Sequence, residues 1–183
     1  MSVEHLKLAA PSAWVARFAA LVPAGGTVLD VACGGGRHAR LFAARGCTVE
    51  AVDRDAAALA QLQDVAGITP VVADLEQEAW PLAGRRCDAV VVTNYLYRPH
   101  FDALLECVAP GGVLIYETFM IGNERFGKPS NPAFLLEADE LLQRVAGRLS
   151  VLAFEQGEVA QPKPAMVQRI CALRGSEALP RIP

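Results

Sequence analysis

A glycine-rich turn follows a short apolar segment near the start of the chain. Residues 27–31 read Thr-Val-Leu-Asp-Val, and three glycines, residues 34–36, come shortly after them. An apolar run of this length is typical of a strand buried on both faces, and residues 37–45 predict a helix. Glycines between a strand and a helix let a ligand approach the backbone, where the amides of the helix N-terminus bind its polar groups. The turn is therefore a candidate binding site, although many glycine-rich turns are simply tight turns.

Two aspartates stand at the ends of the next two predicted strands. Asp53 ends the strand 47–52, and Asp74 ends the strand 69–73. The carboxyl ends of parallel strands meet at the edge where open α/β sheets bind their ligands. A carboxylate at the first of these positions can accept hydrogen bonds from both hydroxyls of a ribose. Either aspartate alone is equally well a turn or capping residue, but together with the glycines they mark three successive strand ends and favour a nucleoside-bearing ligand.

Predicted strands and helices alternate along the chain. Strands are expected at 27–31, 47–52, 69–73, 88–93, 113–119, 149–154 and 165–173, and helices at 11–22, 37–45, 55–64, 99–108 and 135–147. This alternation predicts an α/β fold, with a Rossmann-like, doubly wound, seven-stranded and mostly parallel sheet. The last two strands are joined by a proline-containing loop without a helix, so we expect an antiparallel pair at the sheet edge. Pro110-Gly111-Gly112 predicts a turn before the fifth strand.

Length and composition indicate one globular domain over residues 1–183, with an N-terminal helix 11–22, a core 27–173 and a short tail 174–183. The net charge of −3 and the lack of a Lys/Arg run argue against a nucleic-acid partner. No stretch approaches the ~20 apolar residues of a membrane span. Five cysteines without a CxxC pair indicate reduced thiols in a cytoplasmic protein, and the three histidines are too scattered for a metal site.

The glycine turn, the two aspartates and the later segments together resemble the class I S-adenosylmethionine-dependent methyltransferases, across nearly the whole chain. Their first motif is an acidic residue followed by glycines at alternate positions, and Asp30-x-Ala32-x-Gly34-x-Gly36 matches it with Ala32 in place of the first glycine. Asp53 matches their ribose-binding acidic residue, and Asp74-Leu75 matches the aspartate that meets the adenine. Residues 92–95 match the segment that passes near the methyl group, and residues 105–112 match the turn before the fifth strand.

The form Asp-x-Ala-Cys-Gly-x-Gly-Arg at residues 30–37 is similar to small bacterial methyltransferases of the tellurite-resistance type. The resemblance implies S-adenosylmethionine as the cofactor, with contacts from Asp30, Ala32, Cys33, Gly34, Gly36, Asp53, Arg54, Asp74, Leu75 and Asn94. The rival interpretation, a nicotinamide-dependent dehydrogenase, requires a Gly-x-Gly-x-x-Gly turn, and the glycines at 34–36 do not supply that spacing.

Methyl transfer from a sulfonium mainly requires that the two reactants be positioned and that water be excluded. A general base is needed only if the acceptor must lose a proton early. Tyr97, His100 and Glu117 are weak candidates by position, because each lies near a carboxyl strand end. The alternatives are surface packing for the tyrosine, a first-turn helix position for the histidine and a capping role for the glutamate.

Residues 122–132 predict a long loop at the same sheet edge, rich in glycine, proline and polar residues. We expect a lid over a polar acceptor, with Tyr95, Asn123, Arg125 and Phe126 at the substrate, although a plain connection is the alternative. Little chain remains for an acceptor domain, which favours a small-molecule acceptor. An S-adenosylmethionine-binding protein without transferase activity remains open, and so does an RNA methyltransferase, which the charge disfavours.

Overall fold

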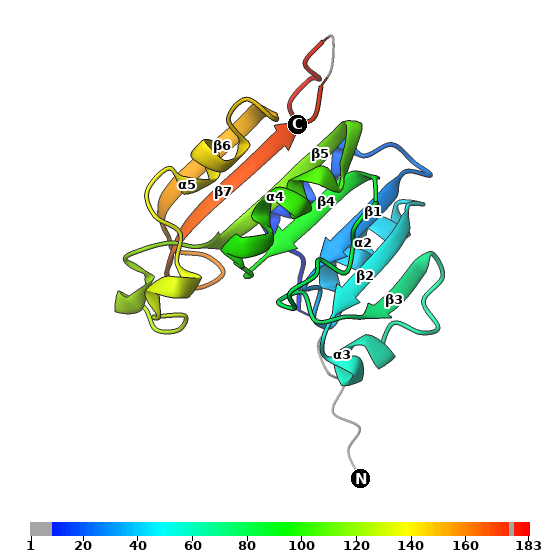
Figure 1. Cartoon of the computed structure of the whole chain (residues 1–183), viewed down its shortest axis with the longest axis horizontal. Helices are drawn as coiled ribbons and strands as arrows, with labels where there is room; N and C mark the ends of the chain where they lie inside the picture. Colours follow the sequence, from blue (N-terminus) through cyan, green and yellow to red (C-terminus); the bar gives the residue numbers. More distant parts are fainter. Residues whose placement is uncertain (1–8, 176–177) are drawn as a thin grey trace.

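A single seven-stranded sheet forms the centre of the computed structural model, which describes residues 9–175 and 178–183 (Figure 1). Its order is β3-β2-β1-β4-β5-β7-β6, with β1 to β5 parallel and β7 antiparallel to both of its neighbours. The strands are β1 Thr27–Val31, β2 Thr48–Asp53, β3 Ile68–Val72, β4 Cys87–Thr93, β5 Val108–Phe119, β6 Ser150–Val159 and β7 Ala165–Leu173. This arrangement confirms the predicted doubly wound, mostly parallel fold. The antiparallel pair lies at one end, with β6 at the edge.

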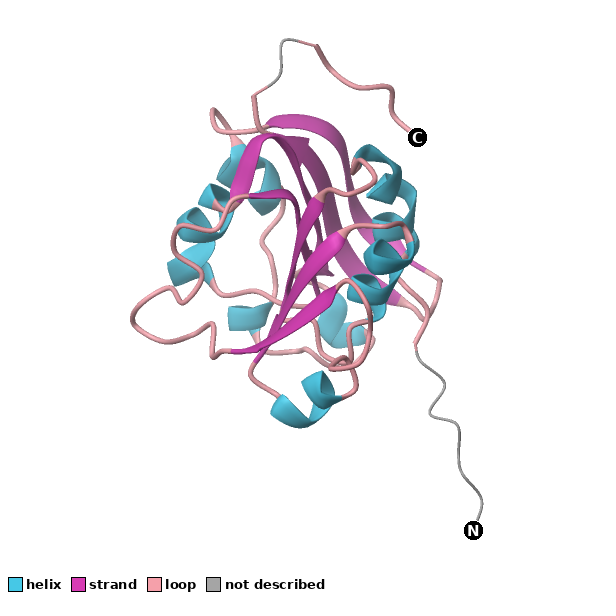
Figure 2. Cartoon of the chain, turned by 90° about the vertical axis from the view of Figure 1, so that its right-hand side faces the viewer, coloured by secondary structure: helices cyan, strands magenta, loops and turns pink. Residues whose placement is uncertain are grey.

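Helices cover both faces of the sheet (Figure 2). They are α1 Ala13–Phe18, η1 Ala19–Leu21, α2 Arg37–Ala44, α3 Ala56–Ala60, η2 Arg98–His100, α4 Phe101–Glu106, η3 Asn123–Arg125, η4 Pro132–Phe134 and α5 Glu140–Val145. One buried cluster joins α1 and α2 to the sheet through residues such as Phe18 and Phe42. A second joins α4 and α5 to the opposite face through Phe101 and Leu141. The alternation in the sequence therefore becomes a three-layer core.

Local signals explain where the helices next to the glycine turn begin. The Ser12 side chain accepts hydrogen bonds from the amides of Trp14 and Val15 and so caps α1. Gly36 precedes α2 with a φ of +75°, a left-handed conformation that favours glycine. A Cβ at this position would lie 2.6 Å from Leu62 Cδ1, so packing as well as conformation requires glycine there.

Several predicted boundaries differ from the structure: α3 ends at Ala60 and not at 64, and β6 continues to Val159 instead of ending at 154. Two further differences have a clear physical cause. The last helix begins at Glu140 and not near 135, because Leu135 and Leu136 are buried in an extended segment. The amide of Leu136 donates to Phe119 and its carbonyl accepts from Ile121, so this segment extends the edge of β5. The predicted turn at 110–112 lies within β5, where the register shifts opposite β4. None of the described helices is long and apolar enough to cross a membrane.

Candidate functional site

Two hydrogen bonds to β2 hold the turn between β1 and α2. The Cys33 amide donates to the carbonyl of Val52 over 3.0 Å, and the Gly34 amide donates to Asp53 Oδ2 over 2.7 Å. Ala32 has a φ of +54°, which costs a non-glycine residue about 1 kcal/mol. These bonds from β2 fix the turn in that conformation.

Asp53 supports the turn and still retains capacity for a ligand. Besides the Gly34 amide, it accepts the amide of Asp55 on Oδ1 over 2.9 Å. A carboxylate has about four lone-pair sites, so two of them stay available. Asp53 is therefore positioned by backbone bonds and still has one acceptor site on each oxygen.

Asp30 lies below the turn and not at its surface. Its side chain is 1% exposed, and Oδ2 accepts the amide of Ala39 in α2 over 2.9 Å. Burial raises the pKa of this carboxyl to about 7, against the opposing influence of the Ala39 bond and of Arg37. Asp30 thus ties β1 to α2. It lines neither of the two cavities described next, so the predicted direct cofactor contact has no geometric support.

Two adjoining cavities lie at the carboxyl edge of the sheet, and Ala32 lines both. The first, which we call the acidic cavity, has a volume of about 140 Å³ and is lined by Ala32, Asp53, Arg54, Ala73, Asp74, Leu75, Glu76 and Tyr95. The second, which we call the glycine cavity, has a volume of about 290 Å³ and is lined by Ala9, Ala32, Cys33, Gly34, Gly35, Arg37, Thr93 and Asn94. The structure thus brings most of the predicted cofactor residues together around two cavities that share Ala32.

The segment after β4 contributes a wall to each cavity. Asn94 has a φ of +55° and donates its amide to the carbonyl of Glu117, which continues the pairing of β4 with β5. The Tyr95 carbonyl accepts the buried hydroxyl of Tyr116 over 2.6 Å. The Tyr95 hydroxyl is itself buried and has no partner among the described residues. Burial, Glu76 and Asp74 raise the pKa of this hydroxyl, so it remains a protonated donor beside the acidic cavity.

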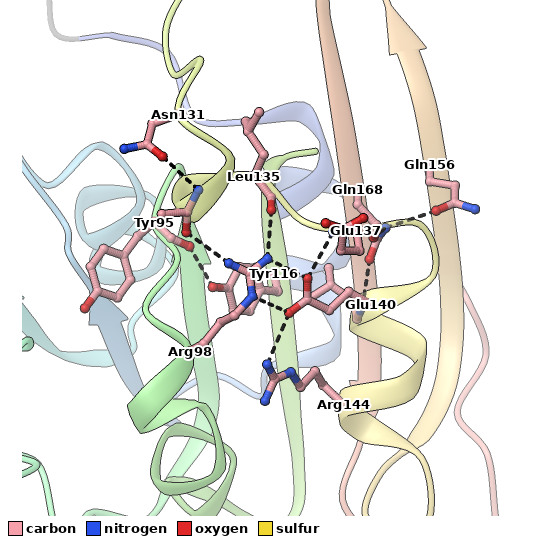
Figure 3. Close-up of polar contacts among 12 residues, drawn as sticks. Tyr95, Arg98, Tyr116, Asn131, Leu135, Glu137, Glu140, Arg144, Gln156 and Gln168 are labelled. Atoms are coloured by element: carbon pink, nitrogen blue, oxygen red, sulfur yellow. Dashed lines mark hydrogen bonds and ion pairs between the residues drawn. The ribbon is translucent and has the colours of Figure 1, made fainter. Parts of the chain in front are cut away.

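Arg98 connects residues 94–98 to α5 and to the segment before α5 (Figure 3). Its guanidinium makes two 2.8 Å bonds to Glu140 and also donates to the carbonyls of Ala133 and Leu135. Arg144 adds a second contact to the same carboxylate, at 3.2 Å. Burial alone would raise the pKa of Glu140, but the bonds from Arg98 and its neighbours bring it below its ordinary value. The wall of the acidic cavity is therefore anchored through an ion pair to α5 and to the segment before it.

A comparison with family models finds one match, to the family described as "Methyltransferase domain", over residues 28–112. That range contains the glycine turn, Asp53, Asp74 and the segment after β4. The match covers a little less than half of the 183-residue chain. The expected resemblance to class I methyltransferases is confirmed. No protein with a curated description matches the chain at a significant level.

Solved structures share the fold at low sequence identity. TehB from Haemophilus influenzae has a TM-score of 0.77 at 18% identity, and the match covers 93% of this chain and 64% of that one. The chain therefore spans less than two thirds of the length of that relative. The N-methyltransferase NodS from Bradyrhizobium japonicum WM9 has a TM-score of 0.66 at 16% identity, with coverages of 88% and 91%. A TehB-like methyltransferase from Corynebacterium glutamicum has a TM-score of 0.65 at 18% identity, with 88% of each chain covered.

The three candidate bases line neither cavity. The Tyr97 hydroxyl donates to the carbonyl of Glu76, and a His100 ring nitrogen contacts the carbonyl of Gln77. Glu117 accepts the Ser12 hydroxyl at 2.8 Å and pairs with Arg169 at 2.9 Å. Because each group already has a protein partner, the geometry favours the structural alternative for all three.

The loop at 122–132 differs from the predicted mobile lid at two positions. Asn123, predicted at the substrate, is 2% exposed and bonds to the carbonyl of Pro129 and the amide of Met166. Arg125, also predicted at the substrate, lies 3.9 Å from Glu158 and over the Phe126 ring. A buried asparagine without those bonds would be costly, so the first of these residues anchors the loop. Neither Arg125 nor Phe126 lines either cavity.

Sequence reasoning missed several residues of the two cavity walls, among them Arg37, Glu76 and Thr93. Arg37 and Thr93 had a signal, because one directly follows the last glycine and the other ends a buried strand. Ala9 had none, since its place in the glycine cavity depends on how the chain before α1 lies against the sheet. Its neighbour Ala10 is held there by Arg37, whose guanidinium donates to the Ala10 carbonyl over 3.2 Å.

Proposed function

We propose that this chain transfers the methyl group of S-adenosylmethionine to a small-molecule acceptor. The observation that carries the proposal is the division of chemistry between the two cavities. The acidic cavity presents carboxylates of Asp53, Asp74 and Glu76, which accept hydrogen bonds from hydroxyl and amino groups. The glycine cavity presents the Gly35 amide and the Arg37 guanidinium, which suit a carboxylate. An adenosine with an amino-acid tail carries these groups at opposite ends, in the same order.

The residues of the site hold and orient the reactants and do little covalent chemistry. When bound, the cofactor supplies a methyl group that is already activated on a sulfonium. The free lone pairs of Asp53 would hold ribose hydroxyls, and Ala32 lies where the two cavities meet, so the reacting centre would be placed beside it. Asn94 and Thr93 close the glycine cavity from the side of β4. Transfer would then depend on alignment and on exclusion of water, without a dedicated base.

A small-molecule acceptor is supported by the charge of the protein and by the size of the site. A net charge of −3 gives no electrostatic attraction for RNA. The two cavities have volumes of about 140 and 290 Å³, which suit small molecules and not a polymer. We further propose that the chain acts as a single domain around its one described sheet. The five cysteines are free and buried, which supports a cytoplasmic location.

Calorimetry with S-adenosylmethionine and S-adenosylhomocysteine tests the cofactor, with NAD as the control ligand. We expect micromolar dissociation constants, on the order of −8 kcal/mol. No heat and no thermal shift with either compound, together with a response to NAD, would contradict the assignment. A screen with radiolabelled cofactor over small-molecule pools and tRNA then tests the acceptor. Labelled tRNA would favour the RNA alternative, and binding without any labelled product would favour a protein without transferase activity.

A further inference from the structure

His38 of α2 is buried, 1% exposed, and contacts two segments that border the glycine cavity. The backbone amide of Ser12 donates to His38 Nε2 over 3.0 Å. Burial, with a smaller contribution from Arg37, lowers the pKa of His38 to about 3. The ring is therefore neutral at ordinary pH and carries one proton. Because Nε2 accepts a hydrogen bond, that proton must lie on Nδ1.

This tautomer fixes the role of Thr93 at the end of β4. Thr93 Oγ1 lies 3.4 Å from His38 Nδ1. Since Nδ1 carries the proton, the threonine oxygen is the acceptor in this contact. Its own hydroxyl proton then has no acceptor among the described residues. Thr93 also lines the glycine cavity, so the hydroxyl is left as a donor at the cavity wall.

The rest of the glycine cavity is also rich in donors. Arg37 forms no ion pair with any described carboxylate, and its guanidinium donates a hydrogen bond to the carbonyl of Ala10. The Gly35 amide donates to no described residue either. Among the lining residues no carboxylate is present to balance these groups. A cavity wall of this kind favours an anionic oxygen on the molecule that enters it.

We propose that Thr93, oriented by His38, donates a hydrogen bond to a carboxylate held in the glycine cavity. Resting on the proposed function, the inference assigns this carboxylate to the amino-acid end of the cofactor. Thr93 is then a binding residue and His38 a positioning residue, because the histidine acts only through the hydroxyl that it orients. Thr93 lies in the segment 92–95 that the sequence motifs single out without a role for its hydroxyl, and His38 lies outside the motifs.

Two nucleoside probes test the inference on the full chain by calorimetry. S-adenosylhomocysteine carries the carboxylate, and methylthioadenosine lacks the whole amino-acid part. Thr93→Val keeps the side-chain shape and removes the hydroxyl, so it should weaken binding of S-adenosylhomocysteine roughly tenfold or more. Binding of methylthioadenosine should not change. Thr93→Ser, which retains the hydroxyl, should restore most of the affinity.

Thr118→Val is the matched control, because Thr118 is 2% exposed on the adjacent strand β5 and lines neither cavity. It should leave both probes unaffected. The inference is overturned if Thr93→Val binds S-adenosylhomocysteine like the parent chain, or if it loses affinity for both probes equally. If the parent chain binds neither probe, the proposed function fails, and that result is distinct from a failure of the Thr93 assignment alone.

Nitrogen NMR of the parent chain gives a second test, which needs no ligand. The ring nitrogens of His38, assigned by the signals lost in His38→Gln, should show a protonated Nδ1 and an unprotonated Nε2 at neutral pH. A charged ring or the opposite tautomer would overturn the inference, because the Thr93 proton would then not be directed into the cavity.

Discussion

Replacing Asp53 by alanine should lower both the stability of the fold and the affinity for the cofactor, and the two losses have different causes. Asp53 accepts two backbone amides, those of Gly34 at 2.7 Å and Asp55 at 2.9 Å. Removing these bonds should lower the free energy of unfolding by about 1 kcal/mol per bond. The lone pairs that remain would hold ribose hydroxyls through charge-assisted bonds. Their loss should weaken binding of S-adenosylhomocysteine by about 1.5–3 kcal/mol, which is roughly 10- to 150-fold in the dissociation constant.

Asp55→Ala is the matched control for this substitution. Asp55 also accepts two backbone amides, from Ala57 and Ala58, and caps α3, but it lines neither cavity. Its loss should cost about 1 kcal/mol of stability and leave the affinity unchanged. Urea unfolding and calorimetry on both variants measure the two effects. Equal affinity losses in the two variants, or none in Asp53→Ala, would refute the assignment of Asp53 to the ribose.

Three further outcomes are expected. The pKa of Asp30 is about 7 in the folded state, against an ordinary value of 3.8, so between these pH values the folded state binds the extra proton. Stability should therefore fall as the pH rises from about 4 to about 7, by at most about 1.4 kcal/mol per pH unit, and Asp30→Asn should flatten this slope in urea unfolding. Arg98→Gln should cost about 2–4 kcal/mol in urea unfolding, because it weakens the pairing of a buried carboxylate. Arg148→Gln, at a similarly exposed arginine with more exposed partners, should cost about 0–1 kcal/mol, and equal losses would contradict the special weight given to Arg98. Phe126→Ala should leave calorimetric affinity for S-adenosylhomocysteine unchanged, since Phe126 lines neither cavity, and a loss of affinity would place the loop in the cofactor site.

The central strands could be predicted from sequence because burial on both faces leaves a continuous local signal. The observed β1 and β7 have the predicted bounds, and β4 begins one residue earlier than expected. The segment 135–139 was predicted as helix because its leucines fit helical spacing too. Its extended form depends on hydrogen bonds to Phe119 and Ile121, more than ten residues away in the chain. No local sequence pattern predicts hydrogen bonds between segments so far apart in the chain.

The candidate site likewise contains residues that the sequence could place and residues that it could not. Asp53 and Asp74 lie at the same cavity because parallel strands place their carboxyl ends together, which the alternation of elements implies. Their roles toward a cofactor remain predictions. The contact of His38 with Ser12 and Thr93 joins residues 26 and 55 positions apart, and it becomes visible only once α1, α2 and β4 are packed. The structure differs from the prediction that Asn123 lies at the substrate for a related reason. A polar residue in a loop gives no sign in the sequence that its side-chain amide will be buried and hydrogen-bonded.

Ala32 stands where the methyltransferase motif has its first glycine. The hydrogen bonds around Ala32 explain how an alanine is held there, and they support the proposed site. A non-glycine residue at a φ of +54° is strained, and such strain persists only where neighbouring bonds hold the backbone in place. Those bonds come from β2, through the Val52 carbonyl to Cys33 and the Asp53 carboxylate to Gly34. The same aspartate lines the acidic cavity, so the group that holds the turn also faces the ligand. Ala32 lines both cavities, and the strained residue therefore lies where a molecule spanning them would cross. Strain, support and binding surface are thus concentrated in one turn, as expected for a preorganised cofactor site.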